Sequence, residues 1–124
     1  MMKRVLLIAL LVVQTGFMKA ADITSISAAF QKGDVTSLQS SLANQVDLTI
    51  VDSNRKCGTQ EAVRLLQDFF SANKPESYQM VHHADKGETG FFVAKMKVGQ
   101  QQYRLNVAYG TENNQLIILS IRIE

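Results

Sequence analysis

The second half of the chain consists of strand-like segments separated by turn sequences. Apolar and polar residues alternate within each segment, as they do in strands that bury one face. Asp85-Lys86-Gly87 and the run 111–114 are turn signals, and only Gly99-Gln100 joins the middle two segments. Strands joined by such short turns pair antiparallel, so this half predicts an antiparallel meander. Its strands are expected at 77–83, 90–98, 101–109 and 115–124.

The Gly99-Gln100 turn also predicts which side chains lie opposite each other. Glycine in the first position suits a two-residue type II′ turn, which places Val98 opposite Gln101. From that pair onward, one face of the hairpin pairs Met96 with Tyr103, Ala94 with Leu105 and Phe92 with Val107. The other face pairs Lys97 with Gln102, Lys95 with Arg104 and Val93 with Asn106.

The last strand also alternates. Its apolar side chains, which we expect to point into the core, are Ile117, Leu119, Ile121 and Ile123.

The first half contains mainly helical patterns. Apolar residues from Ile23 recur at helical spacing up to Gly33, a typical helix stop, and Asp34 then caps a second short helix. Thr59 is the expected N-cap of a third helix that runs to about Asn73, before Pro75. Residues 46–50 alternate as a strand, and 52–58 are expected to form a loop. The order α-α-β-α-β-β-β-β predicts an α+β domain, with helices on one face of a curved, mostly antiparallel sheet.

The first twenty residues are typical of a secretory signal peptide. Lys3 and Arg4 precede the apolar run Val5–Val13, which is much shorter than the roughly 20 residues that span a membrane. Cleavage is expected near Ala20 or Ala21, which leaves 21–124 as a single domain with no membrane span. We expect this domain in the periplasm or outside the cell.

Removal of this segment changes the net charge. Three of the 13 basic residues leave with it, so 10 basic residues face 11 acidic ones and the charge falls from +2 to −1. A near-neutral domain gives no general electrostatic case for nucleic-acid binding.

Cys57 is the only cysteine, so no internal disulfide forms. Because it lies in the expected loop, we expect a partly exposed thiol without a special role. The alternatives are that it forms an intermolecular disulfide or acts as a nucleophile.

The pattern resembles the nuclear transport factor two-like fold, a cystatin-like cone in which three N-terminal helices pack on a strongly curved sheet. Within it, the chain is similar to small secreted Bacteroidetes-type proteins of unknown function. The resemblance implies this fold for most of 22–124 and an apolar pocket at the open end of the cone, but no catalytic set. It rests on the run 29–34, on 66–71 with the following Asn73 and Pro75, on His82 and on the ending 121–124.

The expected pocket combines aromatic and sulfur-containing side chains with one histidine. His82 is the best single candidate for chemistry, because its ordinary pKa near 6.5 suits proton transfer. Filling of a closed core by the same side chains is the alternative. The expected lining residues are Phe30, Tyr78, Met80, His82, Phe92, Met96 and Tyr103.

Four cations are expected on the opposite face of the sheet: Lys95, Lys97, Arg104 and Arg122. Lys95 lies opposite Arg104, a like-charge pair that destabilises unless something compensates it. These four cations either form an ordinary solvated surface or bind an acidic partner or an anionic glycan. No aromatic residues are interleaved among these cations, which argues against single-stranded nucleic acid.

The sequence therefore favours an exported, non-catalytic module that binds a small apolar ligand or a protein partner. No phosphate loop, nucleophile elbow or metal-spaced cluster occurs, so neither a cofactor nor a metal is expected. A small lyase or isomerase that uses His82 with Tyr78 or Tyr103 is one alternative. A homodimer that forms through the exposed sheet face is another.

Overall fold

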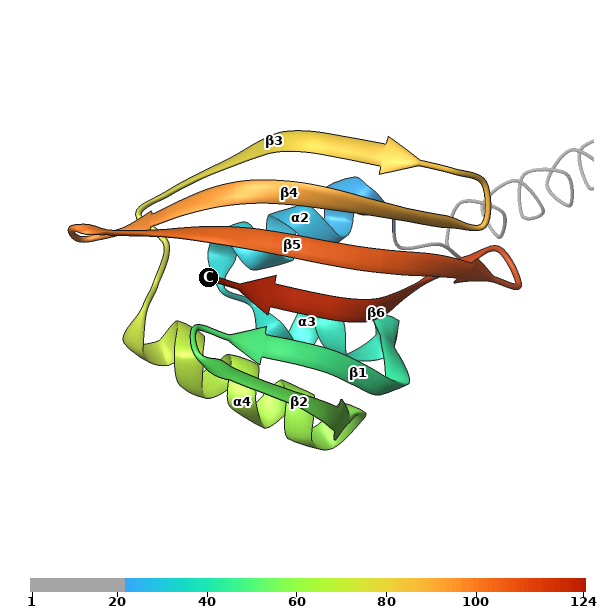
Figure 1. Cartoon of the computed structure of the whole chain (residues 1–124), viewed down its shortest axis with the longest axis horizontal. Coiled ribbons are helices and arrows are strands. Elements are labelled where there is room, and N and C mark those ends of the chain that lie inside the picture. The colour runs from blue at the N-terminus through green and yellow to red at the C-terminus, as the bar shows by residue number, and fades with distance from the viewer. Residues whose placement is uncertain (1–21) are drawn as a thin grey trace, which may run out of the picture.

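The computed structural model describes residues 22–124, so the predicted signal peptide, 1–20, lies outside the described residues. Helices α2 (Ile23–Lys32), α3 (Val35–Leu38) and α4 (Thr59–Ala72) pack on one side of a curved sheet (Figure 1). A short 3-10 turn, η1 (Gln39–Ser41), follows α3. The strands are β1 (Leu42–Ile50), β2 (Ser53–Gly58), β3 (Ser77–Asp85), β4 (Thr89–Val98), β5 (Gln101–Glu112) and β6 (Gln115–Ile123).

The six strands form one mixed sheet in the order β2-β1-β6-β5-β4-β3. Strand β1 runs parallel to β6, and every other neighbouring pair is antiparallel. The expected α+β fold with a curved, mostly antiparallel sheet is confirmed. We call the sheet face that packs on the helices the inner face, and the opposite one the outer face (Figure 1).

Two of the three predicted helix ends are confirmed: Gly33 ends α2 in the left-handed conformation, and the Asp34 side chain caps α3 by accepting from the Ser37 backbone N–H. The N-cap of α2, which was not predicted, is Asp22, whose side chain accepts from the Ser25 backbone N–H. The pKa of each carboxyl is lowered, mainly by its hydrogen bonds to that serine. Thr59 is not the N-cap of α4: Gly58 is, and the Thr59 hydroxyl donates to the Ala43 carbonyl instead.

The prediction of a loop at 52–58 is wrong, because Ser53–Gly58 form edge strand β2 and only Asp52 lies in a turn. Strands β1 and β2 are joined by a tight turn in which Ile50 pairs with Ser53. Val51 adopts a φ of 55°, a conformation that β-branched residues rarely take, and its backbone N–H donates to the Ile123 carbonyl. Val-Asp is not a recognisable hairpin sequence, so the turn left no usable signal.

The core lies between the inner face and the helices. Phe30 contacts both Phe70 and Phe92, with ring centroids 6.2 and 6.4 Å apart. The predicted hairpin register is confirmed in full, from Val98 opposite Gln101 to Phe92 opposite Val107. This register places the inner-face side chains of β4 and β5 in the core: Phe92, Ala94, Met96, Leu105 and Val107 are all buried.

The prediction for the last strand is partly wrong. Ile121 and Ile123 are buried as expected, but the pairing of β5 with β6 shifts between Ala108 and Tyr109. The extra residue in β6 is Leu119, which is 44% exposed, and the shift moves Ile118 rather than Ile117 into the core. A β-bulge of this kind reverses the faces of all residues beyond it.

Candidate functional site

The predicted pocket is filled at its centre. Phe30, Phe92 and Met96 are each at most 1% exposed, and they form part of the continuous core. Met80 is partly buried against that core. These side chains come together as predicted, and their packing matches the closed-core alternative.

The two tyrosines of the predicted pocket lie on the inner face at the rim of the core. The Tyr78 and Ser27 hydroxyls share a hydrogen bond of 2.6 Å that joins β3 to α2. Burial raises the pKa of Tyr78, and the bond to Ser27 partly offsets the shift. The Tyr103 ring packs edge-on against Phe69 of α4, with centroids 5.3 Å apart. Both tyrosines therefore have structural contacts.

The prediction that His82 faces the core is wrong. The pairing of β3 with β4 shifts between Met80 and His82, which leaves Val81 as the extra residue of a bulge. His82 lies opposite Val93, is exposed, and places its ring 5.5 Å from that of Phe91. It therefore belongs to the outer face, whereas Tyr78 and Tyr103 belong to the inner face.

The outer face carries the four predicted cations, and all four are exposed. Lys95 lies directly opposite Arg104, as expected. Arg122 is paired with Glu124 at 2.7 Å, and this hydrogen bond raises the pKa of its guanidinium further. Within residues 22–124, no ion pair is formed by Lys95, Lys97 or Arg104, so their charges face solvent. This cluster of Lys95, Lys97, Arg104 and Arg122 is called the basic end below.

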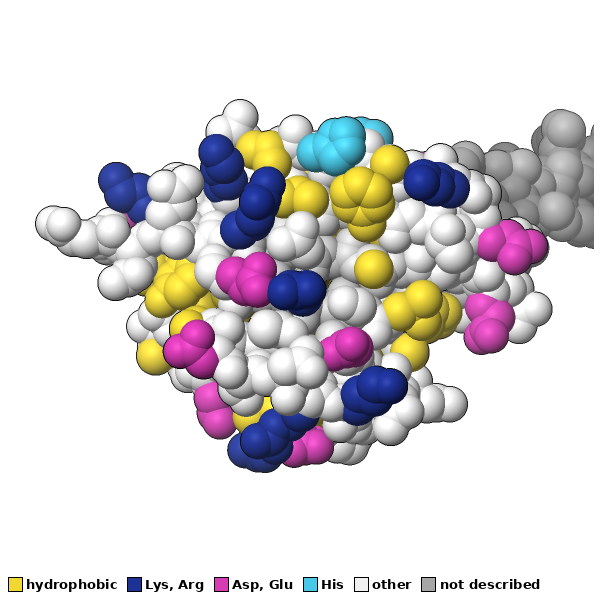
Figure 2. Space-filling view, in the orientation of Figure 1, with side chains coloured by type: hydrophobic (Ala, Val, Ile, Leu, Met, Phe, Trp, Pro, Cys, Tyr) yellow, Lys and Arg dark blue, Asp and Glu magenta, His cyan; other side chains and the backbone are white. Residues whose placement is uncertain are grey.

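An apolar strip continues from the basic end along the outer face. Phe91 and Ile117 are partly buried there, and Val81 and Leu119 are 42% and 44% exposed. Figure 2 shows this face: over β3, β4 and β5 dark blue side chains gather to the left, hydrophobic ones follow, and acidic ones lie at the right-hand tip, close to a further dark blue side chain. The strip was not predicted, because Ile117 and Leu119 were expected in the core and the irregularity at Leu119 in β6 places them on the outer face instead.

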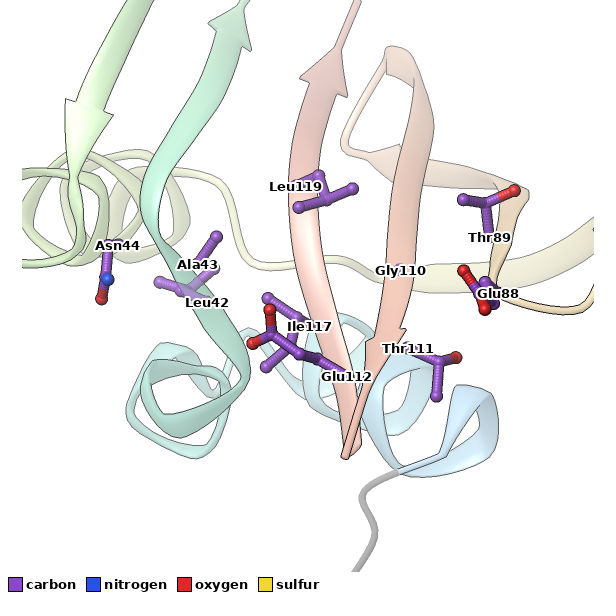
Figure 3. Close-up of a pocket in the computed structure, with 10 residues that line it drawn as sticks. All are labelled: Leu42, Ala43, Asn44, Glu88, Thr89, Gly110, Thr111, Glu112, Ile117 and Leu119. Carbon is purple, nitrogen blue, oxygen red and sulfur yellow. The ribbon is translucent and has the colours of Figure 1, made fainter. Parts of the chain in front are cut away.

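A groove of about 420 Å³ lies at the acidic tip of the outer face. Ile117 and Leu119 of β6 lie between Ala43 of β1 on one side and the β4 and β5 ends on the other (Figure 3). The carboxylates of Glu88 and Glu112 also line the groove. A groove with an apolar floor and two carboxylates favours a partner that offers apolar groups beside a positive charge.

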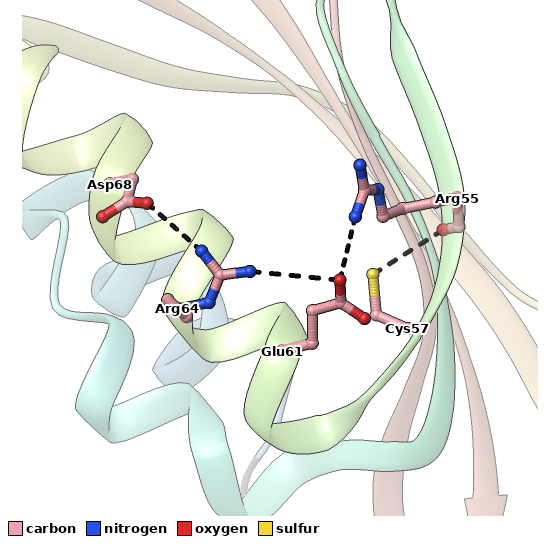
Figure 4. Close-up of polar contacts among 5 residues, drawn as sticks. All are labelled: Arg55, Cys57, Glu61, Arg64 and Asp68. Atoms are coloured by element: carbon pink, nitrogen blue, oxygen red, sulfur yellow. Dashed lines mark hydrogen bonds and ion pairs between the residues drawn. The ribbon is translucent and has the colours of Figure 1, made fainter.

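A chain of ion pairs follows the exposed side of α4 (Figure 4). Arg55 contacts Glu61 at 2.9 Å, and Arg64 lies 4.0 Å from Glu61 and 3.8 Å from Asp68. Arg64 and Asp68 are four residues apart, the spacing at which side chains meet on one face of a helix. Each member is well exposed, so these pairs contribute little stability and resemble an ordinary solvated surface.

Cys57 is not the partly exposed thiol that the sequence suggests. It is 1% exposed on β2 and directs its thiol to the Arg55 carbonyl at 3.8 Å (Figure 4). Burial and then the nearby Glu61 raise its pKa. A buried thiol with a raised pKa is a poor nucleophile. Within residues 22–124, no group of three His, Cys, Asp or Glu side chains is arranged so that it could hold a metal ion.

None of the helices within 22–124 has both the length and the apolar character needed to cross a membrane.

Among functionally curated proteins, none matches this chain. Solved structures do match. A Bacteroides uniformis protein is 25% identical, with a TM-score of 0.79 over 84% of this chain and 96% of its own. A Bacteroides fragilis protein is also 25% identical, with a TM-score of 0.76 over 83% and 97%.

More distant structures share the fold alone. An NTF-2-like protein of unknown function from Silicibacter pomeroyi is 9% identical, with a TM-score of 0.59 over 82% of this chain and 87% of its own. Both Bacteroides structures are of proteins in the family described as domain of unknown function DUF4783. The model of that family matches residues 23–124. The chain therefore belongs to the DUF4783 family, a family of unknown function whose fold here is NTF2-like.

Proposed function

We propose that this protein is a non-catalytic interaction module, that the outer face of its sheet is the docking surface, and that a second copy of the chain is the partner. One observation carries the proposal. The outer face leaves Leu119 and Val81 almost half exposed beside the partly buried Phe91 and Ile117, and α2, α3 and α4 all pack on the other face (Figure 1). An apolar strip rimmed by polar residues is typical of a protein-binding surface.

Charge favours a second copy as the partner. The basic end lies near the β4–β5 turn, and Glu88 and Glu112 lie at the opposite tip (Figure 2). A copy related by a two-fold axis across the strands places each basic end over the partner's acidic tip, with the two apolar strips between them. Such an interface is self-complementary, as two-fold symmetry requires. Stacked sheets lie about 10 Å apart, which is close enough for the apolar strips to touch and for the opposite charges to meet.

The arrangement does not support the lyase or isomerase alternative. That mechanism needs His82 and a tyrosine hydroxyl at one substrate, within about 3 Å of the proton they exchange. His82 lies on the outer face, and Tyr78 donates to or accepts from Ser27 on the inner face. The sheet separates the two groups, so we place the function in binding.

We also propose that the protein works outside the cytoplasm, as the basic start and apolar run of residues 1–20 suggest. The mass of the protein recovered from the periplasm or medium of expressing cells tests this. Loss of residues up to Ala20 or Ala21 is expected. An intact N-terminal methionine in that fraction contradicts export by cleavage.

A matched pair of substitutions tests the docking surface. Leu119 on the outer face is 44% exposed, and Val51 in the β1–β2 turn is 48% exposed, so glutamate at either site costs little core packing. We expect Leu119→Glu to weaken self-association about tenfold or more, since it puts a charge in the centre of the interface. Val51→Glu is expected to leave it unchanged. Light scattering coupled to size exclusion measures both, and equal behaviour of the two variants contradicts the proposed surface.

A further inference from the structure

The hydroxyl of Tyr109 is buried without a hydrogen-bond partner. Tyr109 is 3% exposed on the inner face of β5, and its hydroxyl oxygen has no partner among the described residues. The partly buried Tyr78, by contrast, has its hydroxyl bonded to Ser27. An unpartnered buried hydroxyl lowers the stability of the fold, so its presence calls for an explanation other than packing.

Gly90 makes room for this hydroxyl. It lies opposite Tyr109 in the β4–β5 ladder, and the tyrosine ring crosses over it. A Cβ at this position would overlap the ring, reaching Cζ at 2.6 Å, and would lie 2.8 Å from the Ala84 carbonyl oxygen. Only glycine therefore allows the Tyr109 hydroxyl to reach the end of β3, where Asp85 follows Ala84.

Tyr109 is part of the wall of a pocket of about 310 Å³. The pocket lies between the first residues of α2, the end of β3 and the β5–β6 hairpin. Two carboxylates line it, and no lysine or arginine does. Lys86, the next residue after Asp85, is exposed. The lining consists of Asp22, Ile23, Thr24, Asp85, Tyr109, Thr111, Asn114 and Leu116.

The Asp85 carboxylate keeps an oxygen available. Asp85 Oδ1 accepts from the Gly87 N–H at 3.2 Å, and within residues 22–124 its other oxygen makes no side-chain hydrogen bond. The Asp22 carboxylate is more occupied, because it accepts from the Ser25 backbone N–H at 2.9 Å and also interacts with the Ser25 side chain. The charge of Asp85 also reaches the tyrosine: after burial, it is the second cause that raises the pKa of Tyr109. The pocket is therefore negative near an unused hydroxyl.

We propose that this pocket binds a small primary ammonium group. The ammonium donates to the Tyr109 hydroxyl oxygen and lies beside the Asp85 carboxylate, and a short apolar chain attached to it contacts Ile23 and Leu116. This site goes beyond the proposed docking function. It lies on the inner side of the sheet, so it remains accessible when the outer face is covered.

The binding test uses the full chain and two probes of equal size. Propylammonium chloride is titrated against n-propanol, its uncharged isostere, and backbone amide shifts of Asp85, Thr111 and Asn114 are followed by NMR. Saturable shifts with propylammonium and not with propanol are expected. Asp85→Asn is expected to weaken binding about tenfold, as loss of one nearby charge implies. Equal shifts from the two probes, or no saturable shift with either, overturn the proposal.

The tyrosine is tested by a matched pair of variants. Tyr109→Phe removes the unpartnered hydroxyl, so we expect it to abolish propylammonium binding while leaving the midpoint of thermal unfolding unchanged or higher. Tyr78→Phe removes a bonded hydroxyl, so it is expected to lower the midpoint and to keep binding. A Tyr109→Phe variant that binds as the wild type does, or that loses as much stability as Tyr78→Phe, overturns the assignment.

Discussion

The Ser27 and Tyr78 hydroxyls are 2.6 Å apart and join helix α2 to edge strand β3. The residues are 51 positions apart in sequence, so the bond closes a long loop. Ser27 is buried and Tyr78 is partly buried, which protects the bond from water. Strand β3 has a single neighbour in the sheet, β4, so this contact is one of the few that fix its inner side.

We expect this bond to contribute about 1 kcal/mol to the free energy of unfolding. Ser27→Ala and Tyr78→Phe should each lower it by about that amount, because each leaves the other hydroxyl without its partner. The double variant should lose less than the sum of the two. Urea unfolding of the four proteins measures the coupling, and fully additive losses contradict an intact bond.

Replacement of Val51 by asparagine should stabilise the protein. Val51 holds a φ of 55° in the β1–β2 turn, which is costly for a β-branched residue. Asparagine tolerates that conformation, and the backbone N–H that bonds Ile123 is kept. We expect a gain of about 0.5–1 kcal/mol in the free energy of unfolding. A loss of stability in urea unfolding would show that the contacts of the valine side chain stabilise the fold by more than its backbone conformation costs.

Cys57 should react with thiol reagents only when the protein opens. Its thiol is buried and its pKa is raised above the ordinary 9.0, so the thiolate is scarce in the native state at neutral pH. The raised pKa has a consequence for stability. The folded state holds the proton more tightly than the unfolded chain, so this contribution is present below pH 9.0 and is lost as the pH rises through the folded pKa.

Urea unfolding between pH 7 and 10 checks this dependence, with Cys57→Ala as the control. The variant should lose stability less steeply above about pH 9, although Tyr78 and Tyr109, whose pKa values are also raised, act in the same direction in both proteins. Rapid labelling of native Cys57 at pH 7, or identical pH profiles for the two proteins, would contradict a buried thiol.

Reversal of charge at the basic end should weaken self-association. Arg122 is neutralised by Glu124, so Lys95→Glu with Arg104→Glu leaves Lys97 alone against two new carboxylates. Both ends of the outer face are then acidic, and two copies arranged end for end repel each other. Adding Glu88→Lys and Glu112→Lys restores opposite charges and should restore association. Both effects should diminish at high salt, since these charges are exposed. Equal association of the double and fourfold variants at low salt argues against the end-for-end arrangement.

The sequence predicts the framework well because turn chemistry and alternation are local properties. Gly99-Gln100 gave the complete β4–β5 register, and Gly33 and Asp34 marked a helix boundary. The errors in the site have one physical cause. Bulges at Val81 and Leu119 insert one residue into a strand, and alternation cannot reveal them, because both neighbouring stretches still alternate. The bulge at Val81 moved His82 out of the expected pocket, and the bulge at Leu119 added Leu119 and Ile117 to the apolar strip.

Sedimentation equilibrium of the wild-type protein tests the proposed docking surface most directly. Measured over a hundredfold range of concentration at low salt, the mass is expected to rise from that of one chain to that of two. A mass that stays at one chain throughout the range would contradict self-association through the outer face.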